Sequence, residues 1–248
     1  MKRLLTVIAL LSTLVTCRAD GRFLDQALAA HCPKSACKIQ NGITLKKFNV
    51  TLVGQGFHRG LDITACFVDS NVAMVAILID LPSAVYANTY ELDNAALRNQ
   101  GPQVKVFGSV DVESIQQFAQ PTALAVYAKL ENLSEPNPEL QHSGIRVAHV
   151  LFPLHARYPY PATPPAGGAY SSAWKWLTSP QTSITIPTPL ILAKTHGESD
   201  WMIVEHSSTI PISWPVPTGN VFHTDFVVLT TIGVVIGSAL IIARSLFK

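Results

Sequence analysis

The chain has 248 residues, 48% of them apolar and 14% charged, which is long and apolar enough for one large or two small domains. Its formal net charge of +2, without a basic cluster, argues against nucleic-acid binding. The sequence holds no nucleophile elbow, phosphate-binding loop or metal-binding histidine–glutamate pair, so it predicts no cofactor and no metal site.

The first residues are typical of a secretory signal peptide. A basic head precedes an apolar run over residues 4–15, and small residues follow at Cys17 and Ala19. This pattern predicts a signal peptide over residues 1–19 that is cleaved after Ala19. The expected exported domain covers residues 20–210 and lies in an oxidising compartment.

Three cysteines remain after that cleavage: Cys32, Cys37 and Cys66. One disulfide is therefore expected, and Cys32 to Cys37 is the simplest pairing. The spacing leaves open a pairing of either residue with Cys66.

Short segments of alternating apolar residues predict about eight β-strands and hence a mainly β, antiparallel sandwich-like domain. The expected strands cover residues 47–53, 61–67, 73–81, 104–112, 123–130, 145–158, 183–192 and 201–205. Residues 24–30 and 90–100 are the candidates for short helices. Two sequons in the exported part, at Asn49 and Asn132, are candidate N-glycosylation sites.

The C-terminal part predicts one transmembrane helix. Residues 226–243 carry no charge and would span about 27 Å as a helix. A proline-containing stalk over residues 211–225 precedes it, with Trp214 expected near the lipid headgroups. The basic tail, residues 244–248, is expected in the cytosol, so the bulk of the chain lies on the other side in a type I orientation. A buried core helix is the alternative.

Two histidine–arginine groupings are the remaining candidates for a site. They are His58 with Arg59, and His155 with Arg157. His155 and Arg157 are two residues apart in an expected strand, so they project from one face and form a candidate anion site. The alternative is structural, with hydrogen bonds to carbonyls or carboxylates of the fold. No catalytic residues are expected, because neither grouping has a positioned nucleophile or carboxylate nearby in the sequence.

Three stretches, taken in order, resemble the PIG-X family, whose members are accessory subunits of the first mannosyltransferase of glycosylphosphatidylinositol (GPI) anchor synthesis. They are GFHR at residues 56–59 with the strand that follows, LPSAVY at 81–86 with YEL at 90–92, and HVLFPLHARY at 149–158. The single C-terminal anchor is similar to the family as well.

The resemblance implies a lumenal, β-rich and non-catalytic protein of the endoplasmic reticulum membrane. It implies that the chain stabilises a multi-pass catalytic subunit (PIG-M-like) that transfers mannose from dolichol-phosphate mannose to the GPI precursor. The family-type positions are expected to shape the fold or the partner surface. They are His58, Arg59, Pro82, Tyr90, Glu91, Pro153, His155 and Arg157.

Gly233 and Gly237 lie four residues apart, on one face of the expected membrane helix, and are candidates for a helix–helix contact. Two other functions stay open. The topology equally fits a single-pass cell-surface β-sandwich receptor or adhesion protein. A membrane-tethered hydrolase that uses His155 and Arg157 ranks last.

Overall fold

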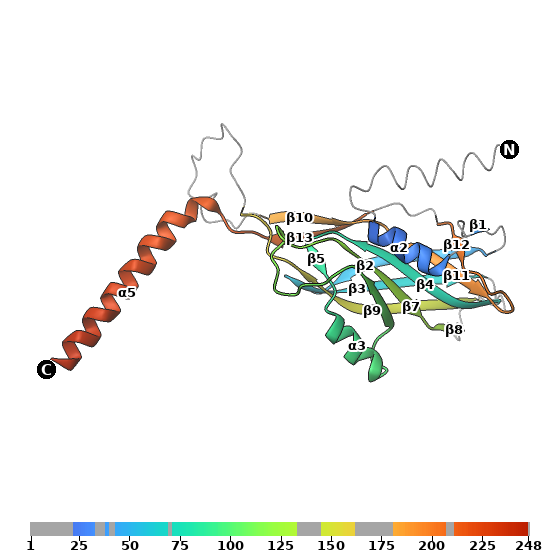
Figure 1. Cartoon of the computed structure of the whole chain (residues 1–248), viewed down its shortest axis with the longest axis horizontal. Coiled ribbons are helices and arrows are strands. Elements are labelled where there is room, and N and C mark those ends of the chain that lie inside the picture. Colours follow the sequence, from blue (N-terminus) through green and yellow to red (C-terminus); the bar gives the residue numbers. More distant parts are fainter. Residues whose placement is uncertain are drawn as a thin grey trace, which may run out of the picture. The chain divides into compact units, whose positions relative to one another are not determined.

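A computed structural model describes residues 22–32, 38–39, 43–68, 71–132, 145–161, 181–206 and 211–247. The predicted signal peptide and Cys37 lie outside these residues. The described residues fall into two units, one within Met1–Arg157 and Ile184–Trp214, the other within Tyr158–Ser183 and Pro215–Lys248. The first unit is mainly β, as the sequence predicts (Figure 1).

Sheet A contains six strands, and β4 and β7 lie in its interior. All of its pairs are antiparallel except β1 with β12. The order is β1 (Lys38–Ile39), β12 (Met202–Val204), β11 (Leu190–Thr195), β4 (Val72–Leu81), β7 (Thr122–Ala128) and β6 (Gln103–Phe107).

Sheet B is antiparallel and contains five strands. Its order is β2 (Leu45–Val53), β3 (His58–Phe67), β9 (Arg146–Ala156) and β5 (Val85–Tyr86), and β8 (Leu130–Asn132) also pairs with β9. Strand β3 alternates in burial from Gly60 onward, and Leu61, Ile63 and Ala65 are fully buried. One face of this sheet therefore forms core, while the other carries its polar residues.

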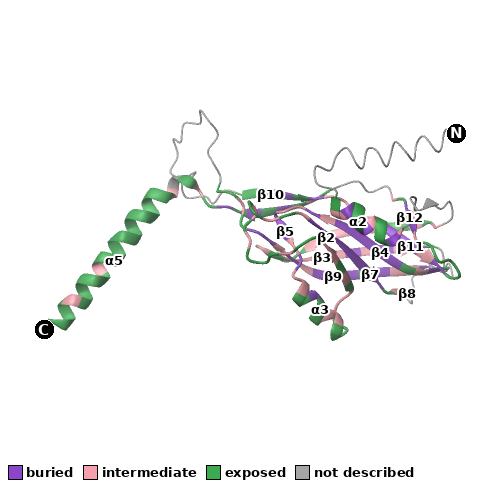
Figure 2. Ribbon diagram, in the orientation of Figure 1, coloured by how far each residue is buried: buried purple, intermediate pink, exposed green. Residues whose placement is uncertain are grey.

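Strand β4 is buried without interruption from Val75 to Ile79 because both of its faces are covered there (Figure 2). Ala76 and Leu78 pack with Leu24 and Ala27 of the helix α2 (Arg22–His31). His31 fixes the end of that helix, since its Nδ1 lies 2.7 Å from the carbonyl oxygen of Ala27 and its Nε2 2.9 Å from the hydroxyl of Tyr127. A nearly continuous apolar run is what a strand between two layers requires.

A third, two-stranded sheet joins β10 (Gln181–Ile186) to β13 (Ile212–Pro217). The single strand expected over residues 183–192 is thus two strands in different sheets. Pro187 and Pro189 stand between them, and proline cannot donate to a ladder. Strand β6 likewise ends at Phe107, earlier than expected, because Gly108 has a φ of +104°.

Part of the predicted stalk is a β-strand of the fold. Trp214 of β13 is fully buried, and its Nε1 donates to the carbonyl oxygen of Gly56 at 3.0 Å. The expectation that Trp214 lies at the lipid headgroups is therefore wrong.

The structure also excludes Cys66 from the expected disulfide. Cys32 is disulfide-bonded, whereas Cys66 is a free thiol.

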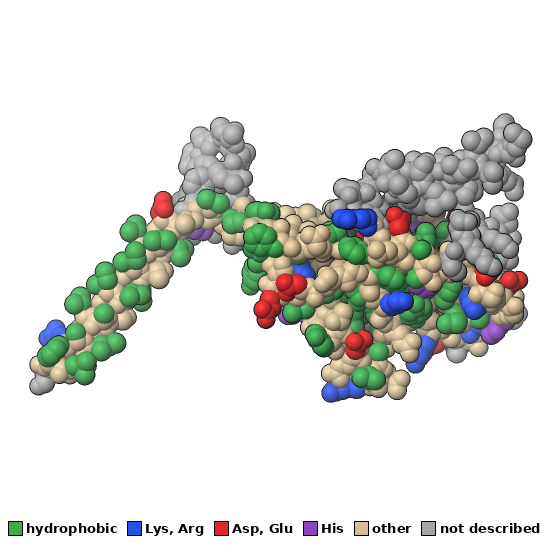
Figure 3. All heavy atoms as spheres, in the orientation of Figure 1, with side chains coloured by type: hydrophobic (Ala, Val, Ile, Leu, Met, Phe, Trp, Pro, Cys, Tyr) green, Lys and Arg blue, Asp and Glu red, His purple; other side chains and the backbone are tan. Residues whose placement is uncertain are grey.

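The second unit contains the C-terminal helix. After the short helix η2 (Val221–His223), α5 (Thr224–Leu246) runs for 23 residues and buries none of its side chains. It is long and apolar enough to cross a membrane, as predicted for residues 226–243. Apolar side chains lie along its whole visible length (Figure 3).

Candidate functional site

The outer face of sheet B brings two of the predicted histidines together. His58 of β3 pairs directly with His155 of β9, and directly opposed residues share a face. The two rings meet edge to face with their centroids 4.4 Å apart. The two histidines are almost a hundred positions apart in the sequence, and the register of β3 and β9 places them side by side.

Glu91 completes the contacts of His155 from a separate element. It lies in the first turn of α3 (Thr89–Leu97), whose N-terminus is capped by Asn88. Nε2 of His155 lies 2.7 Å from Oε2 of Glu91, and the side chains are 12% and 44% exposed. This hydrogen-bonded pair links helix α3 to strand β9 of sheet B.

Tyr86 lies between His155 and the buried Arg157. Its ring stacks on that of His155 at 5.1 Å, and the guanidinium of Arg157 lies 4.4 Å from the Tyr86 ring centroid. Arg157 is 5% exposed and donates to the carbonyl oxygen of Ser114. Burial lowers the pKa of Arg157, while Tyr86 and Asp111 act in the opposite direction.

We refer to His58, Tyr86, Glu91, His155 and Arg157 as the histidine–tyrosine cluster. Its ring contacts and the His155–Glu91 pair connect β3, β5, β9 and α3, and Arg157 adds a hydrogen bond to the carbonyl of Ser114 outside the cluster. Nδ1 of His155 and Nε of Arg157 are buried without a hydrogen-bond partner. Within the described ranges, no group of three or more His, Cys, Asp or Glu residues is placed to hold a metal ion. The contacts of the cluster therefore hold secondary-structure elements together.

A second histidine–carboxylate pair, His149 with Asp62, lies further along the same face. Nε2 of His149 is 2.9 Å from Oδ1 of Asp62, and both side chains are accessible to solvent. Because solvent screens such exposed pairs, this one contributes little to stability.

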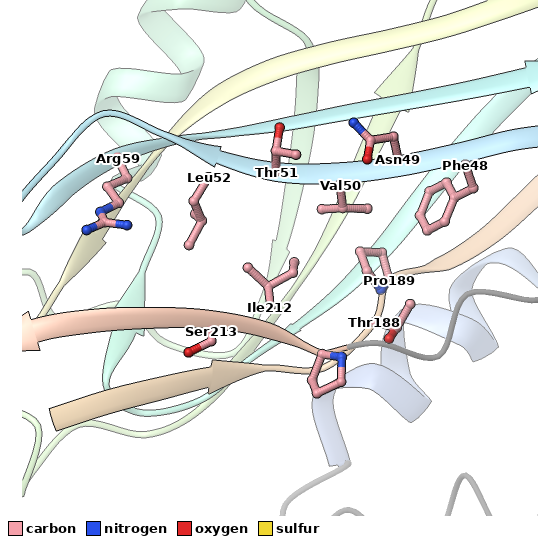
Figure 4. A pocket seen from close by; sticks show the side chains of 11 residues that line it. Phe48, Asn49, Val50, Thr51, Leu52, Arg59, Thr188, Pro189, Ile212 and Ser213 are labelled. Atoms are coloured by element: carbon pink, nitrogen blue, oxygen red, sulfur yellow. The ribbon is translucent and has the colours of Figure 1, made fainter.

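Arg59 points to the other side of sheet B, as its neighbour position to His58 requires. Its guanidinium carbon lies 5.7 Å from the ring of Trp214, and its Nε is buried without a hydrogen-bond partner. Arg59 also lines a groove of about 480 Å³ (Figure 4). We call this the lateral groove; its other lining residues are Phe48, Asn49, Val50, Thr51, Leu52, Thr188, Pro189, Pro211, Ile212 and Ser213.

The remaining predicted positions lie outside the cluster. The carbonyl of Pro82 accepts from the N–H of Val85 in the turn before β5. Tyr90 is 82% exposed on α3. Pro153 stands opposite Gly60, in the stretch of β9 between its pairs with β8 and with β5, where a missing N–H is tolerated.

The two candidate modification sites differ in setting. Asn49 is exposed on β2, and Thr51 of the same sequon is exposed on the same face. Asn132 is the last residue of β8, and the rest of its sequon lies outside the described residues.

Gly233 and Gly237 lie on α5, where a Cβ on either would meet no other group of the chain within 4 Å. The helix therefore does not require glycine at these positions for its own packing.

Sequence reasoning missed three groups that contact the predicted residues His155, Arg157 or Arg59. Tyr86 lies within a family-type stretch but gives no signal of its own beyond an aromatic residue in a short strand. Trp214 was assigned to the membrane, and the carbonyl of Ser114 carries no side-chain pattern at all. The register of β5 and β9 places Tyr86 beside His155, whereas Trp214 and Ser114 are brought in from β13 and from the segment after β6 by tertiary packing.

Two solved structures that resemble the chain are crystal structures of BcpA, the major pilin subunit of Bacillus cereus, and of a variant of it. The identity is 10% and the TM-score 0.28 in both cases, with 70% of this chain covered. The chain spans 40% of the length of that pilin. A comparison with curated protein sequences found no match.

The family comparison is more specific. The model of the family described as PIG-X / PBN1 matches residues 54–247. The matched region contains the histidine–tyrosine cluster, Arg59 and the whole of α5. The chain therefore belongs to the PIG-X/PBN1 family, which serves GPI-anchor biosynthesis in the endoplasmic reticulum as a mannosyltransferase accessory subunit.

Proposed function

We propose that this chain is a non-catalytic, stabilising subunit of the GPI mannosyltransferase I complex of the endoplasmic reticulum. In this role it supports transfer of the first mannose from dolichol-phosphate mannose to the GPI precursor. The observation that carries the proposal is the family match, which runs through the β-domain and includes the apolar helix α5.

The contacts of the histidine–tyrosine cluster support a structural role. His155 uses Nε2 on Glu91, and Arg157 donates to the carbonyl of Ser114 and lies against Tyr86. A general base or an anion-binding pair would direct these groups toward a substrate. Here they connect secondary-structure elements, so loss of the cluster should lower the amount of folded subunit.

The proposed topology places the β-domain in the lumen. Arg244 follows the apolar core of α5, and basic residues flanking a membrane helix stay preferentially on the cytosolic side. A polyprenyl-linked sugar donor requires a path within the bilayer, which a single helix does not enclose. A multi-pass, PIG-M-like subunit would supply that path, and α5 would pack beside it.

The GPI-precursor lipids of cells that lack this chain test the proposal. We expect accumulation of the glucosaminyl-phosphatidylinositol species that awaits its first mannose, with reversal by the intact chain. A normal lipid profile would contradict the proposal and favour the cell-surface receptor hypothesis. Normal rescue by a well-expressed His155→Ala variant would dispose of the hydrolase hypothesis, since that residue would be its central group.

A further inference from the structure

The lateral groove lies beside β2, the terminal strand of sheet B. Strand β2 pairs with β3 on one side, and within the described part of the chain no strand pairs with it on the other. Residues of β13 and the segment with Thr188 and Pro189 form the opposite wall of the groove (Figure 4). A terminal strand presents a row of backbone N–H and C=O groups, which is a template for an added strand.

The groove-lining part of β2 lacks the residues that normally block strand addition. Lys46, Lys47 and a register shift lie at the start of the strand. Residues 48–52 (FNVTL) carry neither charge nor proline. Protection of the edge is thus confined to one end, and the segment along the groove remains suited to pairing with another chain.

The side chains of residues 48–52 favour an added strand in which apolar residues occupy every second position. Phe48, Val50 and Leu52 are half-buried and point into the groove (Figure 4). Their partners on β3 include Ile63 and Leu61, which are fully buried in the core. An added strand with apolar side chains at every second position would extend this core layer.

Arg59 adds charge complementarity to the groove. Its side chain lines the cavity, with the guanidinium carbon 5.7 Å from the ring centroid of Trp214. A carboxylate on an occupant would supply both an acceptor and the opposite charge.

We propose that the lateral groove is a β-addition site for an extended segment of another protein, with alternating apolar side chains and one carboxylate that pairs with Arg59. The groove volume of about 480 Å³ suits part of such a segment. A lipid chain would leave the backbone polar groups of β2 without partners. That the segment belongs to the lumenal part of the mannosyltransferase rests on the proposed function; the binding mode does not.

The first test fills the groove in the full-length chain and measures copurification with the tagged catalytic subunit from membranes. Val50→Trp places a bulky side chain in the groove, whereas Val53→Trp makes the same change on the exposed face of the same strand. We expect recovery to fall about tenfold for Val50→Trp and to stay within about twofold for Val53→Trp. Arg59→Gln should lower recovery more than Arg59→Lys does. Where the intact chain restores the first mannose, wild-type recovery with Val50→Trp would overturn the placement of the segment in the mannosyltransferase.

The second test does not depend on how well the tryptophan variants fold. A photo-crosslinking phenylalanine derivative replaces Leu52 or, as the control, Val53, in native membranes. We expect the adduct at position 52 to map to one segment of a second protein that alternates apolar residues and contains a carboxylate. Its yield should fall in an Arg59→Gln background. Adducts with lipid alone, with a second copy of this chain, or with the same pattern at both positions would overturn the proposal.

The two tests separate this inference from the proposed function. If Val50→Trp and wild type give the same recovery and adducts while the intact chain restores the first mannose, the groove proposal fails and the proposed function stands. If the lipid profile of cells without the chain is normal but the Arg59-dependent adduct at position 52 forms, the proposed function fails and the β-addition site stands.

Discussion

His155 of β9 and Glu91 of α3 form a hydrogen-bonded pair across 64 residues of sequence, with 2.7 Å between Nε2 and Oε2. A double-mutant cycle with His155→Ala and Glu91→Ala measures their coupling. Because Glu91 is 44% exposed, solvent screens the pair, and we expect about 0.5–1 kcal/mol in the free energy of unfolding. Tyr90→Ala, on the same helix and 82% exposed, is the control and should change stability by less than about 0.5 kcal/mol. Additive single changes would show that the pair is not coupled.

Arg157 should not tolerate replacement by lysine. Its buried guanidinium lies over the ring of Tyr86 and donates to the carbonyl of Ser114, and an ammonium group reproduces neither geometry. We expect Arg157→Lys to lower the free energy of unfolding by about 1–3 kcal/mol, measured by urea unfolding of the detergent-solubilised chain. Arg98→Lys, an exposed change at the end of α3, should be nearly neutral. Equal effects of the two variants would mean that the contacts of Arg157 contribute nothing specific.

The glycines of α5 matter only if a partner helix packs on them. An added Cβ at Gly233 or Gly237 meets nothing within 4 Å in the chain itself. Replacing both with leucine should therefore leave the β-domain stable and reduce copurification with the catalytic subunit several-fold. Val235→Leu with Ala239→Leu, on the opposite face of the helix, is the matched control. Unchanged recovery of the glycine variant would leave the lumenal domain as the site of contact.

The thiol of Cys66 should be slow to react. Burial raises its pKa, and nearby Lys47 and Lys46 act in the opposite direction with smaller effect. The midpoint of its alkylation rate against pH should lie above that of the same thiol in the urea-unfolded chain, with Cys66→Ser as the blank. By linkage, the contribution of the neutral thiol to stability is complete below the unfolded pKa and is lost as pH rises through the folded pKa. An alkylation midpoint at or below that of the urea-unfolded chain would contradict the burial of the Cys66 thiol.

Asn49 should carry an N-glycan if the β-domain is lumenal. Asn49 and Thr51 are both exposed on the face of β2 opposite Phe48, Val50 and Leu52, so a glycan there would point away from the apolar wall of the lateral groove (Figure 4). We expect Asn49→Gln and Thr51→Ala to remove the same glycosidase-sensitive mass, whereas Thr51→Ser retains the sequon and the glycan. If Asn49→Gln and Thr51→Ala both keep the glycosidase-sensitive mass, the glycan lies at another residue. Asn132 is then the next position to replace.

The sequence predicted most strands because their alternation is strong, but not how they are shared between sheets. Residues 61–67 show this, since their alternation survives as the buried pattern of β3. Ile212–Pro217 was missed because its prolines indicate a stalk, whereas in the structure it pairs with β10 and buries Trp214. His155 and Arg157 were expected together from their spacing, whereas their contacts with Glu91 and Tyr86 depend on long-range register.

The position of β4 between β7 and β11 has a consequence for synthesis of the chain. One edge of β4 can pair with β7 soon after it emerges, but its other partner, β11, ends roughly 110 residues later. At about 5–20 residues per second, this interval lasts roughly 5–20 s. During that time the most apolar strand of the domain has one open edge. Folding of this subunit should therefore depend on protection of the nascent chain until β11 has been translated.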